Sequence, residues 1–194
     1  MKPLRVLPLS ATAFVGLIAS TSAFAQTVVP TPPFSAVKLE GGGHVVIRHG
    51  DVQQIRLLHG STEFTRFVVE RDDPNTLHIY ACNNDCPHRY DLEVEITTPR
   101  IEALAISGGG SIDGDASLSG LQELTLAVDG GGTIDTRAMD SGTVTAAVRG
   151  GGVIEVRARN QLTAAVQGGG RIKYWGNPRV TQVVEGGGRV DHGD

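Results

Sequence analysis

The stretch Ala127-Val128-Asp129-Gly130-Gly131-Gly132-Thr133-Ile134 contains the motif that decides the fold. A glycine triplet with an apolar residue two positions before it and another two positions after it occurs six times along the chain. The triplets start at Gly41, Gly108, Gly130, Gly150, Gly168 and Gly186. The last five are separated by 22, 20, 18 and 18 residues, so the sequence is an internal repeat with a period near 20.

Apolar and polar side chains alternate around each triplet, which indicates strands with one buried face. The apolar positions before the triplets hold Leu39, Ile106, Val128, Val148, Val166 and Val184. Those after the triplets hold Val45, Ile112, Ile134, Ile154, Ile172 and Val190. Each unit therefore predicts a strand, a glycine corner, a short second strand and a polar turn, such as 138–142 or 175–178.

A unit of this length cannot bury its own apolar face, whereas like units stacked at the strand spacing of ~4.8 Å bury a continuous core. No segment has a helical period of useful length. We therefore predict an all-β fold, a single-stranded parallel β-helix. The known preference of parallel crossover connections predicts a right-handed solenoid. Glycine at the corners permits positive φ and close backbone approach; a stripe of exposed amides that holds an anion or a sugar is the alternative role.

Residues 34–100 are less regular than the repeats. One degenerate unit surrounds Gly41, and strands are predicted at 53–58, 64–70, 76–81 and 92–96. Terminal units of solenoids are irregular in this way because they close one end of the core. These irregular N-terminal strands and the repeats together make one predicted domain, 34–194.

The first 25 residues have the features of a signal peptide. Lys2 and Arg5 precede an apolar stretch, and Ala23-Phe24-Ala25 is an A-x-A cleavage site, so the mature chain is expected to begin at Gln26. Residues 26–33 are predicted to be an extended leader. The apolar stretch is shorter than the ~20 residues of a membrane anchor, and no lipid-attachment cysteine follows the cleavage site. We expect no transmembrane helix and a periplasmic or secreted location.

The charge balance of the mature chain excludes some partners. Removing Lys2 and Arg5 leaves 15 of the 17 basic residues against 21 acidic ones. The remaining basic residues form no stripe in the sequence. This argues against nucleic acid and against anionic membrane surfaces as partners.

The arrangement of motifs resembles a known bacterial family, the "putative auto-transporter adhesin, head GIN domain" family. The motifs that carry the resemblance are Glu95-Ile96-Thr97-Thr98-Pro99, Ile106-Ser107-Gly108-Gly109-Gly110-Ser111-Ile112 and Tyr174-Trp175-Gly176-Asn177-Pro178. The resemblance covers 34–194 and implies a parallel β-helix, an exported location and an adhesin-like role without catalytic residues. This chain departs from the family pattern in having two cysteines and complete Gly-Gly-Gly triplets.

Cys82 and Cys86 are the only cysteines, and a short-loop disulfide is the expected state of such a pair in an exported protein. A disulfide across so small a loop restrains a local turn more than the whole fold. The alternative is a metal site formed by the two thiols with His88 and His78, although four ligands are not evident. We predict no metal and no cofactor.

Enzymatic function is the second hypothesis, because β-helices include polysaccharide lyases and hydrolases. Asp113 and Asp135 fall in one outward row on adjacent units, but no arginine or histidine is expected beside them. The six histidines are scattered, and no Ser/His/Asp arrangement is evident. We therefore predict no catalytic residues and a non-enzymatic, surface-binding role in the envelope.

Two features point to partners. Trp175 is predicted to face outward, since Tyr174 shares the inward parity of Ile172, and is a candidate contact for a sugar ring or a protein. The last unit has Gln182 in an inward row and no evident cover. It is expected to fray or to associate end to end with another copy. The ligand itself, an envelope or extracellular glycan or protein, is not identified by the sequence.

Overall fold

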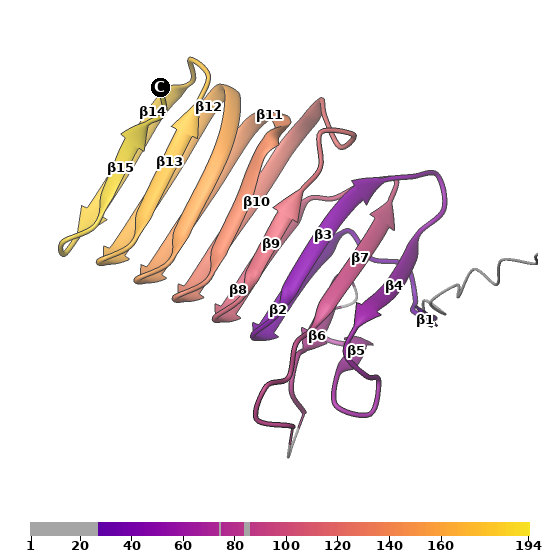
Figure 1. Cartoon of the computed structure of the whole chain (residues 1–194). Coiled ribbons are helices and arrows are strands. Elements are labelled where there is room, and N and C mark those ends of the chain that lie inside the picture. Colours follow the sequence, from indigo (N-terminus) through magenta and orange to yellow (C-terminus); the bar gives the residue numbers. More distant parts are fainter. Residues whose placement is uncertain (1–26, 74, 84–85) are drawn as a thin grey trace, which may run out of the picture.

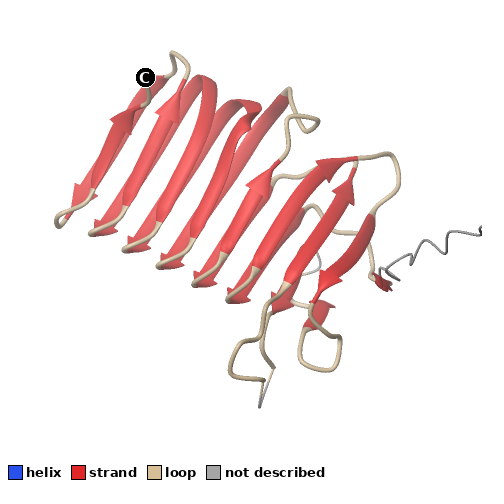
Figure 2. Ribbon diagram, viewed as in Figure 1, coloured by secondary structure: helices blue, strands red, loops and turns tan. Residues whose placement is uncertain are grey.

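The computed structural model describes residues 27–73, 75–83 and 86–194, where all regular structure is β-strand (Figure 2). The predicted signal peptide lies outside these residues. None of the described residues belongs to a helix long and apolar enough to cross a membrane. The strands are β1 (Thr27–Val29), β2 (Ala36–Gly41), β3 (His44–His49), β4 (Gln54–His59), β5 (Arg66–Val69), β6 (Thr76–Tyr80), β7 (Glu93–Thr98), β8 (Ala103–Gly108), β9 (Ser111–Gly114), β10 (Leu121–Gly130), β11 (Thr133–Gly150), β12 (Val153–Gly168), β13 (Arg171–Trp175), β14 (Arg179–Glu185) and β15 (Arg189–His192).

The strands form one large, mostly parallel sheet, which confirms the predicted all-β class and the parallel pairing of successive repeats. Gly130 of β10 pairs with Gly150 of β11, and Gly150 pairs with Gly168 of β12, so each repeat lies beside the next with its triplet aligned. Figure 1 shows these repeats side by side, following one another towards the C-terminus. The repeat period of the sequence is therefore the step from one paired strand to the next.

The sheet folds back on itself into two layers. β1, β4, β7, β3, β9, the first parts of β11 and β12, β13 and β15 form what we call the front layer. β5, β6, β2, β8, β10, the second parts of β11 and β12, and β14 form the rear layer. β11 and β12 belong to both, and the core lies between the layers.

The predicted inward rows are buried and in register. Ile134, Ile154 and Ile172 pair in succession in the front layer, and each is 0 % exposed. The equivalent rear-layer row consists of Val128, Val148 and Val166. This alternation explains why an apolar residue is needed at every second position of each strand.

Only two glycines of each triplet are required by the corner. Gly150 has φ +111°, and a Cβ built there would lie 2.7 Å from the carbonyl oxygen of Gly130. A Cβ at Gly152 would lie 2.4 Å from a methyl carbon of Val128, whereas one at Gly151 would meet nothing within 4 Å. The close backbone approach expected at the corners therefore applies to the first and third positions of the triplet and not to the middle one.

The order of strands in space differs from their order in the sequence at the N-terminal end. Gly41 pairs directly with Gly108, although 67 residues separate them. The intervening segment folds back, so that β6 and β7 lie on the opposite sides of β2 and β3 from β8 and β9. The long segment between the first two triplets, which we call the N-terminal excursion, thus forms the N-terminal end of the stack.

The strands predicted within 53–96 are present, and they close this end with antiparallel pairings. β4 pairs antiparallel with β7, β5 with β6, and β1 with β4. β1 lies in the segment predicted as an extended leader, where it forms the outermost strand of the front layer.

The connection from the front layer to the rear layer within a repeat differs from the predicted polar turn. Residues 138–142 lie inside the continuous strand β11, whose pairing with β12 shifts register between Thr136 and Asp140 and again between Ser141 and Thr143. Met139 is 0 % exposed there, because this connection also contributes to the core. The chain does leave the sheet after Trp175, as predicted, and re-enters it at Arg179.

Candidate functional site

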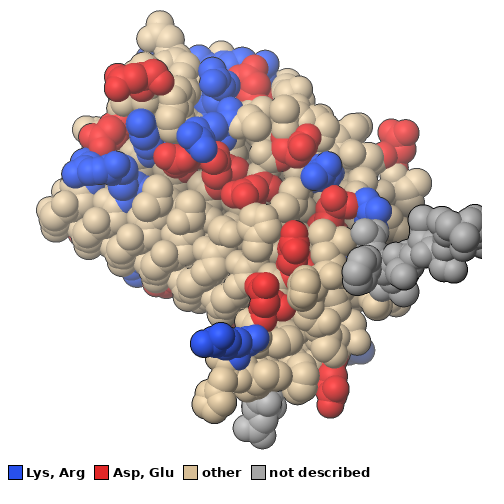
Figure 3. Space-filling model, in the orientation of Figure 1, with Lys and Arg blue, Asp and Glu red and all other residues tan. Residues whose placement is uncertain are grey.

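Charged side chains gather over the front layer, whereas the edge formed by the glycine corners is uncharged (Figure 3). A depression of about 720 Å³ lies on this charged face. We call it the Trp175 depression. It is lined by Asp113, Gly114, Asp135, Arg137, Ala138, Arg157, Lys173, Trp175 and Asp194.

The repeat places these side chains together. Outward residues at one position of successive units pair across the strands as Asp113, Asp135, Glu155 and Lys173. Two residues further along, Arg157 of β12 pairs with Trp175 of β13. Because strand residues two apart face the same side, both rows project onto the front face.

Trp175 lies at the edge of the depression and is half-buried, as expected for an outward residue next to the last repeat. Its indole N–H donates a hydrogen bond to the backbone oxygen of Asp194 (3.3 Å). The guanidinium carbon of Arg137 lies 5.3 Å from the ring centroid, and the Lys173 ammonium lies 5.1 Å from it. Both are within the range of cation–π attraction, which holds the ring beside two positive charges.

Arg137 and Asp135, which both line the depression, form an ion pair. Arg137 Nε lies 3.0 Å from Asp135 Oδ2 and 3.1 Å from Glu155 Oε2. Burial acts to raise the pKa of Asp135, but hydrogen bonds from Arg137 outweigh it and the pKa is lowered. The same hydrogen bonds raise the pKa of Arg137. Asp135 is therefore held ionised near neutral pH and is unsuited to donating a proton.

Two other cations of the depression have no carboxylate partner among the residues that the structure describes. Lys173 contacts the Trp175 ring and makes no salt bridge with any described residue. Arg157 is exposed, and its Nε donates a hydrogen bond to the backbone oxygen of Arg137 (3.2 Å). The depression thus combines an aromatic ring with two positive charges that remain available to an anionic ligand.

The structure corrects the expectation that no histidine or arginine accompanies Asp113 and Asp135. Arg137 reaches Asp135 from two positions along the same strand, and His44 lies beside Asp113 on the neighbouring strand β3. His44 comes from a distant part of the sequence, since β3 pairs with β9 only because of the N-terminal excursion. No local sequence signal predicts this pairing.

The same contact brings a serine, a histidine and an aspartate together, which sequence reasoning missed. His44 Nδ1 is 2.7 Å from Ser111 Oγ, and Nε2 is 3.7 Å from Asp113 Oδ2. The second distance is too long for the hydrogen bond that orients a catalytic imidazole. The backbone N–H of Ser111 donates to the oxygen of Gly43 (2.8 Å), so it is not free to stabilise an oxyanion.

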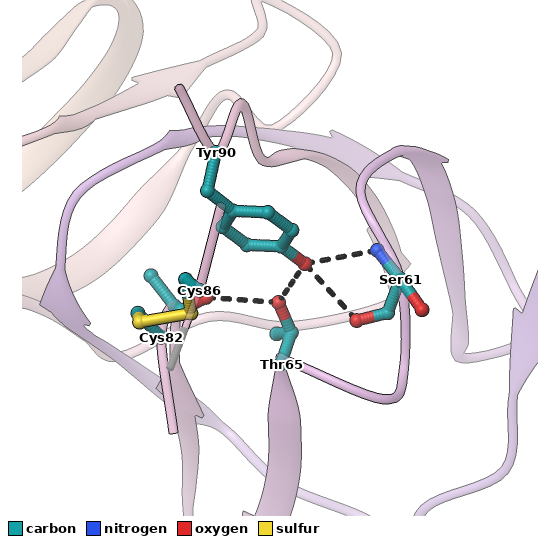
Figure 4. The surroundings of a disulfide bond; sticks show 6 residues. Ser61, Thr65, Cys82, Cys86 and Tyr90 are labelled. Carbon is teal, nitrogen blue, oxygen red and sulfur yellow. Dashed lines mark hydrogen bonds between the residues drawn. A yellow bond between two sulfur atoms is a disulfide. The ribbon is translucent and has the colours of Figure 1, made fainter. Parts of the chain in front are cut away.

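The predicted disulfide between Cys82 and Cys86 is present, with a Cα–Cα separation of 6.0 Å. It lies in the loop that replaces a glycine corner between β6 and β7. Figure 4 shows Tyr90 beside it: the hydroxyl accepts a hydrogen bond from the N–H of Ser61 (2.9 Å) and lies 2.6 Å from the hydroxyl of Thr65. Tyr90 ties this loop to the segment before β5, whereas the disulfide closes a turn within the loop.

The disulfide removes the two thiols from the alternative metal site. Among the described residues, no three histidine, cysteine or acidic side chains are grouped in a way that could hold a metal ion. His78, the other candidate ligand, is buried in the rear layer, where its Nδ1 lies 2.9 Å from Glu40 Oε1.

A second groove, of about 550 Å³, runs across the rear layer. Its floor consists of small outward residues at one position of successive repeats, namely Ala105, Ala127, Ala147 and Ala165. A ladder of polar contacts borders it, in which Arg149 contacts Gln167 (3.4 Å) and Gln167 contacts Glu185 (3.1 Å). These polar groups are paired with one another, unlike the free cations of the Trp175 depression.

Comparison with known proteins supports the resemblance found in the sequence. The family model described as "Putative auto-transporter adhesin, head GIN domain" matches residues 33–122 and 113–178. A search of the curated proteins finds no match.

A similar fold occurs among solved structures. A putative adhesin from Bacteroides fragilis is 16 % identical, with a TM-score of 0.54, and the alignment covers 89 % of this chain and 98 % of that one. A putative adhesin from Parabacteroides merdae is 14 % identical, with a TM-score of 0.41 and coverage of 88 % and 96 %. At this level of identity the first likeness shows the fold alone.

Proposed function

Since the chain belongs to the "Putative auto-transporter adhesin, head GIN domain" family, we propose that it is an exported, non-enzymatic binding protein whose repeats wind as a right-handed parallel β-helix. The aligned parallel pairing of successive repeats supports the β-helix, and the preference of parallel crossovers supports its hand. Left-handed connections in a crystal structure would contradict this part of the proposal.

Export is supported by two independent features. The N-terminal sequence has the charge, apolar stretch and A-x-A site of a cleaved signal. The Cys82–Cys86 disulfide is of a kind that persists in oxidising compartments such as the periplasm. Mass spectrometry of the protein from fractionated cells should find a mature N-terminus at Gln26 outside the cytoplasm. An intact N-terminus in the cytoplasmic fraction would argue against export.

We propose that the ligand is an acidic glycan that binds at the Trp175 depression. The observation that carries this proposal is that the aromatic ring of Trp175 lines one depression with two cations, Lys173 and Arg157, that have no carboxylate partner in the described chain. A sugar ring packs against an indole through its C–H groups, and a uronic acid carboxylate would pair with the free cations.

A non-enzymatic role is supported by the state of the polar groups. Asp135 is paired with Arg137 and its pKa is lowered, whereas a glycosidase needs a carboxylic acid whose pKa is raised. The Ser111 backbone N–H is already bonded to Gly43. These observations disfavour the competing hypothesis of a carbohydrate-active enzyme, which the reducing-sugar assay described below tests directly.

Calorimetric titration with oligogalacturonate and with a neutral oligosaccharide of equal length tests the ligand class. We expect binding of the acidic probe only, weakened about tenfold or more by Trp175→Ala, as for a central aromatic contact. Arg157→Gln should also weaken it, whereas Arg149→Gln, an exposed arginine of the rear layer, should not.

A screen of acidic and neutral glycans should precede this titration, and a reducing-sugar assay should run beside it. Absence of binding to any acidic glycan, or binding that Trp175→Ala leaves unchanged, would refute the assignment of the site. Turnover of a bound glycan would refute the non-enzymatic role while leaving the site in place.

A further inference from the structure

The C-terminal edge of the sheet, formed by β14 and β15, is open on one side. In the described chain β14 pairs only with β12, and β15 pairs only with β13. Val184 is 39 % exposed, although its partner Val166, one repeat earlier in the same inward row, is 0 % exposed. Unpaired backbone groups beside an uncovered apolar core favour the addition of another strand.

The opposite end of the stack does not offer a matching surface. It is closed by the short strands β1 and β5 and by β4, which run antiparallel to their neighbours. A second copy added head to tail would therefore not find a parallel repeat to continue. Two copies that meet through the same C-terminal edge require no such match, because a two-fold interface uses one patch twice.

The sequence of β14 is complementary to itself when read in the antiparallel direction. Arg179 and Glu185 stand at equal distances on either side of Gln182, and both face outward. Val180 and Val184 flank Gln182 symmetrically on the inward side. An antiparallel pair of β14 strands centred on Gln182 would therefore match opposite charges outside and apolar side chains inside.

We propose that two copies of this chain form a dimer in which their β14 strands pair antiparallel about a two-fold axis at Gln182. Arg179 of each copy then lies opposite Glu185 of the other. The two Gln182 amides meet at the axis, where each can donate a hydrogen bond to the other. The pairing satisfies the free backbone groups of both edges and covers Val180 and Val184. This inference goes beyond the proposed glycan binding and does not depend on it.

Sedimentation velocity of the purified protein across micromolar concentrations tests the proposal. We expect a concentration-dependent dimer for the native chain. Arg179→Glu places like charges opposite each other twice, so it should weaken dimerisation about tenfold or more. The double variant Arg179→Glu/Glu185→Arg restores both opposite-charge pairs and should recover most of the affinity. Far-ultraviolet circular dichroism of each variant checks that the fold is retained.

Cross-linking tests the register of the pairing. Residues directly opposite each other in antiparallel strands have Cα atoms ~4.5–5.5 Å apart, within the range of a disulfide. Gln182→Cys should therefore give a covalent dimer on mild oxidation, whereas Thr163→Cys on the interior strand β12 should not. A protein that stays monomeric at 100 micromolar and below, polymers larger than a dimer, or a dimer that neither variant affects would each overturn the proposal.

Discussion

The three glycines of one corner provide a matched test of the fold, because the same methyl group is added at three successive positions. Gly150→Ala, Gly151→Ala and Gly152→Ala differ only in what the new Cβ meets. The structure predicts that the first and third variants are strongly destabilised and that the second is not. Variation in side-chain chemistry cannot account for such a pattern.

The expected magnitudes follow from the local geometry. At Gly150 an alanine must adopt φ +111°, which costs about 1–3 kcal/mol, and its Cβ also overlaps a backbone oxygen that cannot rotate away. We expect a total loss of about 3 kcal/mol or more. Overpacking against Val128 and the Gly132 oxygen should cost about 1–3 kcal/mol at Gly152. Gly151→Ala should lie between a loss of about 0.5 kcal/mol and a gain of about 1 kcal/mol.

Urea denaturation followed by circular dichroism measures these differences as shifts in the free energy of unfolding. Equal losses at Gly150 and Gly151 would refute the reasoning, since they would mean that the middle glycine is constrained by something other than the corner. A neutral Gly150→Ala would be equally damaging, because it would show that the backbone does not need the left-handed conformation there. Gly151→Ala is the matched control, because it adds the same methyl group to the same corner without a contact.

Four further predictions concern the core, the depression, the loop and the C-terminal edge. Ile154→Ala should cost about 2–5 kcal/mol because the side chain is fully buried, whereas Asp135→Ala should cost less than about 1 kcal/mol in the same urea titration. The lowered pKa of Asp135 contributes stability above about pH 4 that is lost as the pH falls through the folded-state value; Asp135→Asn should reduce this acid dependence, and an unchanged pH profile would contradict it. Replacing Cys82 and Cys86 by serine should cost at most about 2 kcal/mol, given the five-residue loop, and alkylation of native protein should find no free thiol. Hydrogen exchange of the monomer should protect 180–190 less than 144–166, and equal protection would mean that the last strands are covered.

Much of the fold follows from the sequence because its signals are local and repeated. An apolar residue at every second position specifies which face of a strand is buried, and the fixed distance between triplets specifies which strand pairs with which. Ile134, Ile154 and Ile172 can therefore be placed in one buried row from the sequence alone, and the structure has them there. The disulfide could also be predicted from the sequence, since the two cysteines are only four positions apart.

The candidate site was only partly predictable. Trp175 could be placed on the outer surface by parity, and Asp113 and Asp135 could be placed in one row. Within the described residues, Lys173 and Arg157 have no carboxylate partner, and this depends on which side chains reach across neighbouring strands. Long flexible side chains select such partners from the space around them, and that space is defined only when the repeats are stacked.

The sequence by itself determined the repeat, the buried rows and the strands of the irregular N-terminal region, because period and parity act over a few neighbouring residues. Only the tertiary structure decided that β2 lies between β6 and β8, that His44 meets Ser111, and that the middle glycine Gly151 faces open space. The first two of these features depend on how the segment between β3 and β8 folds back, so that strands far apart in the sequence become neighbours. The folding of this segment is stabilised by burial of the apolar residues at the whole N-terminal end of the core. A short sequence pattern cannot predict it, because the residues involved are far apart in the sequence.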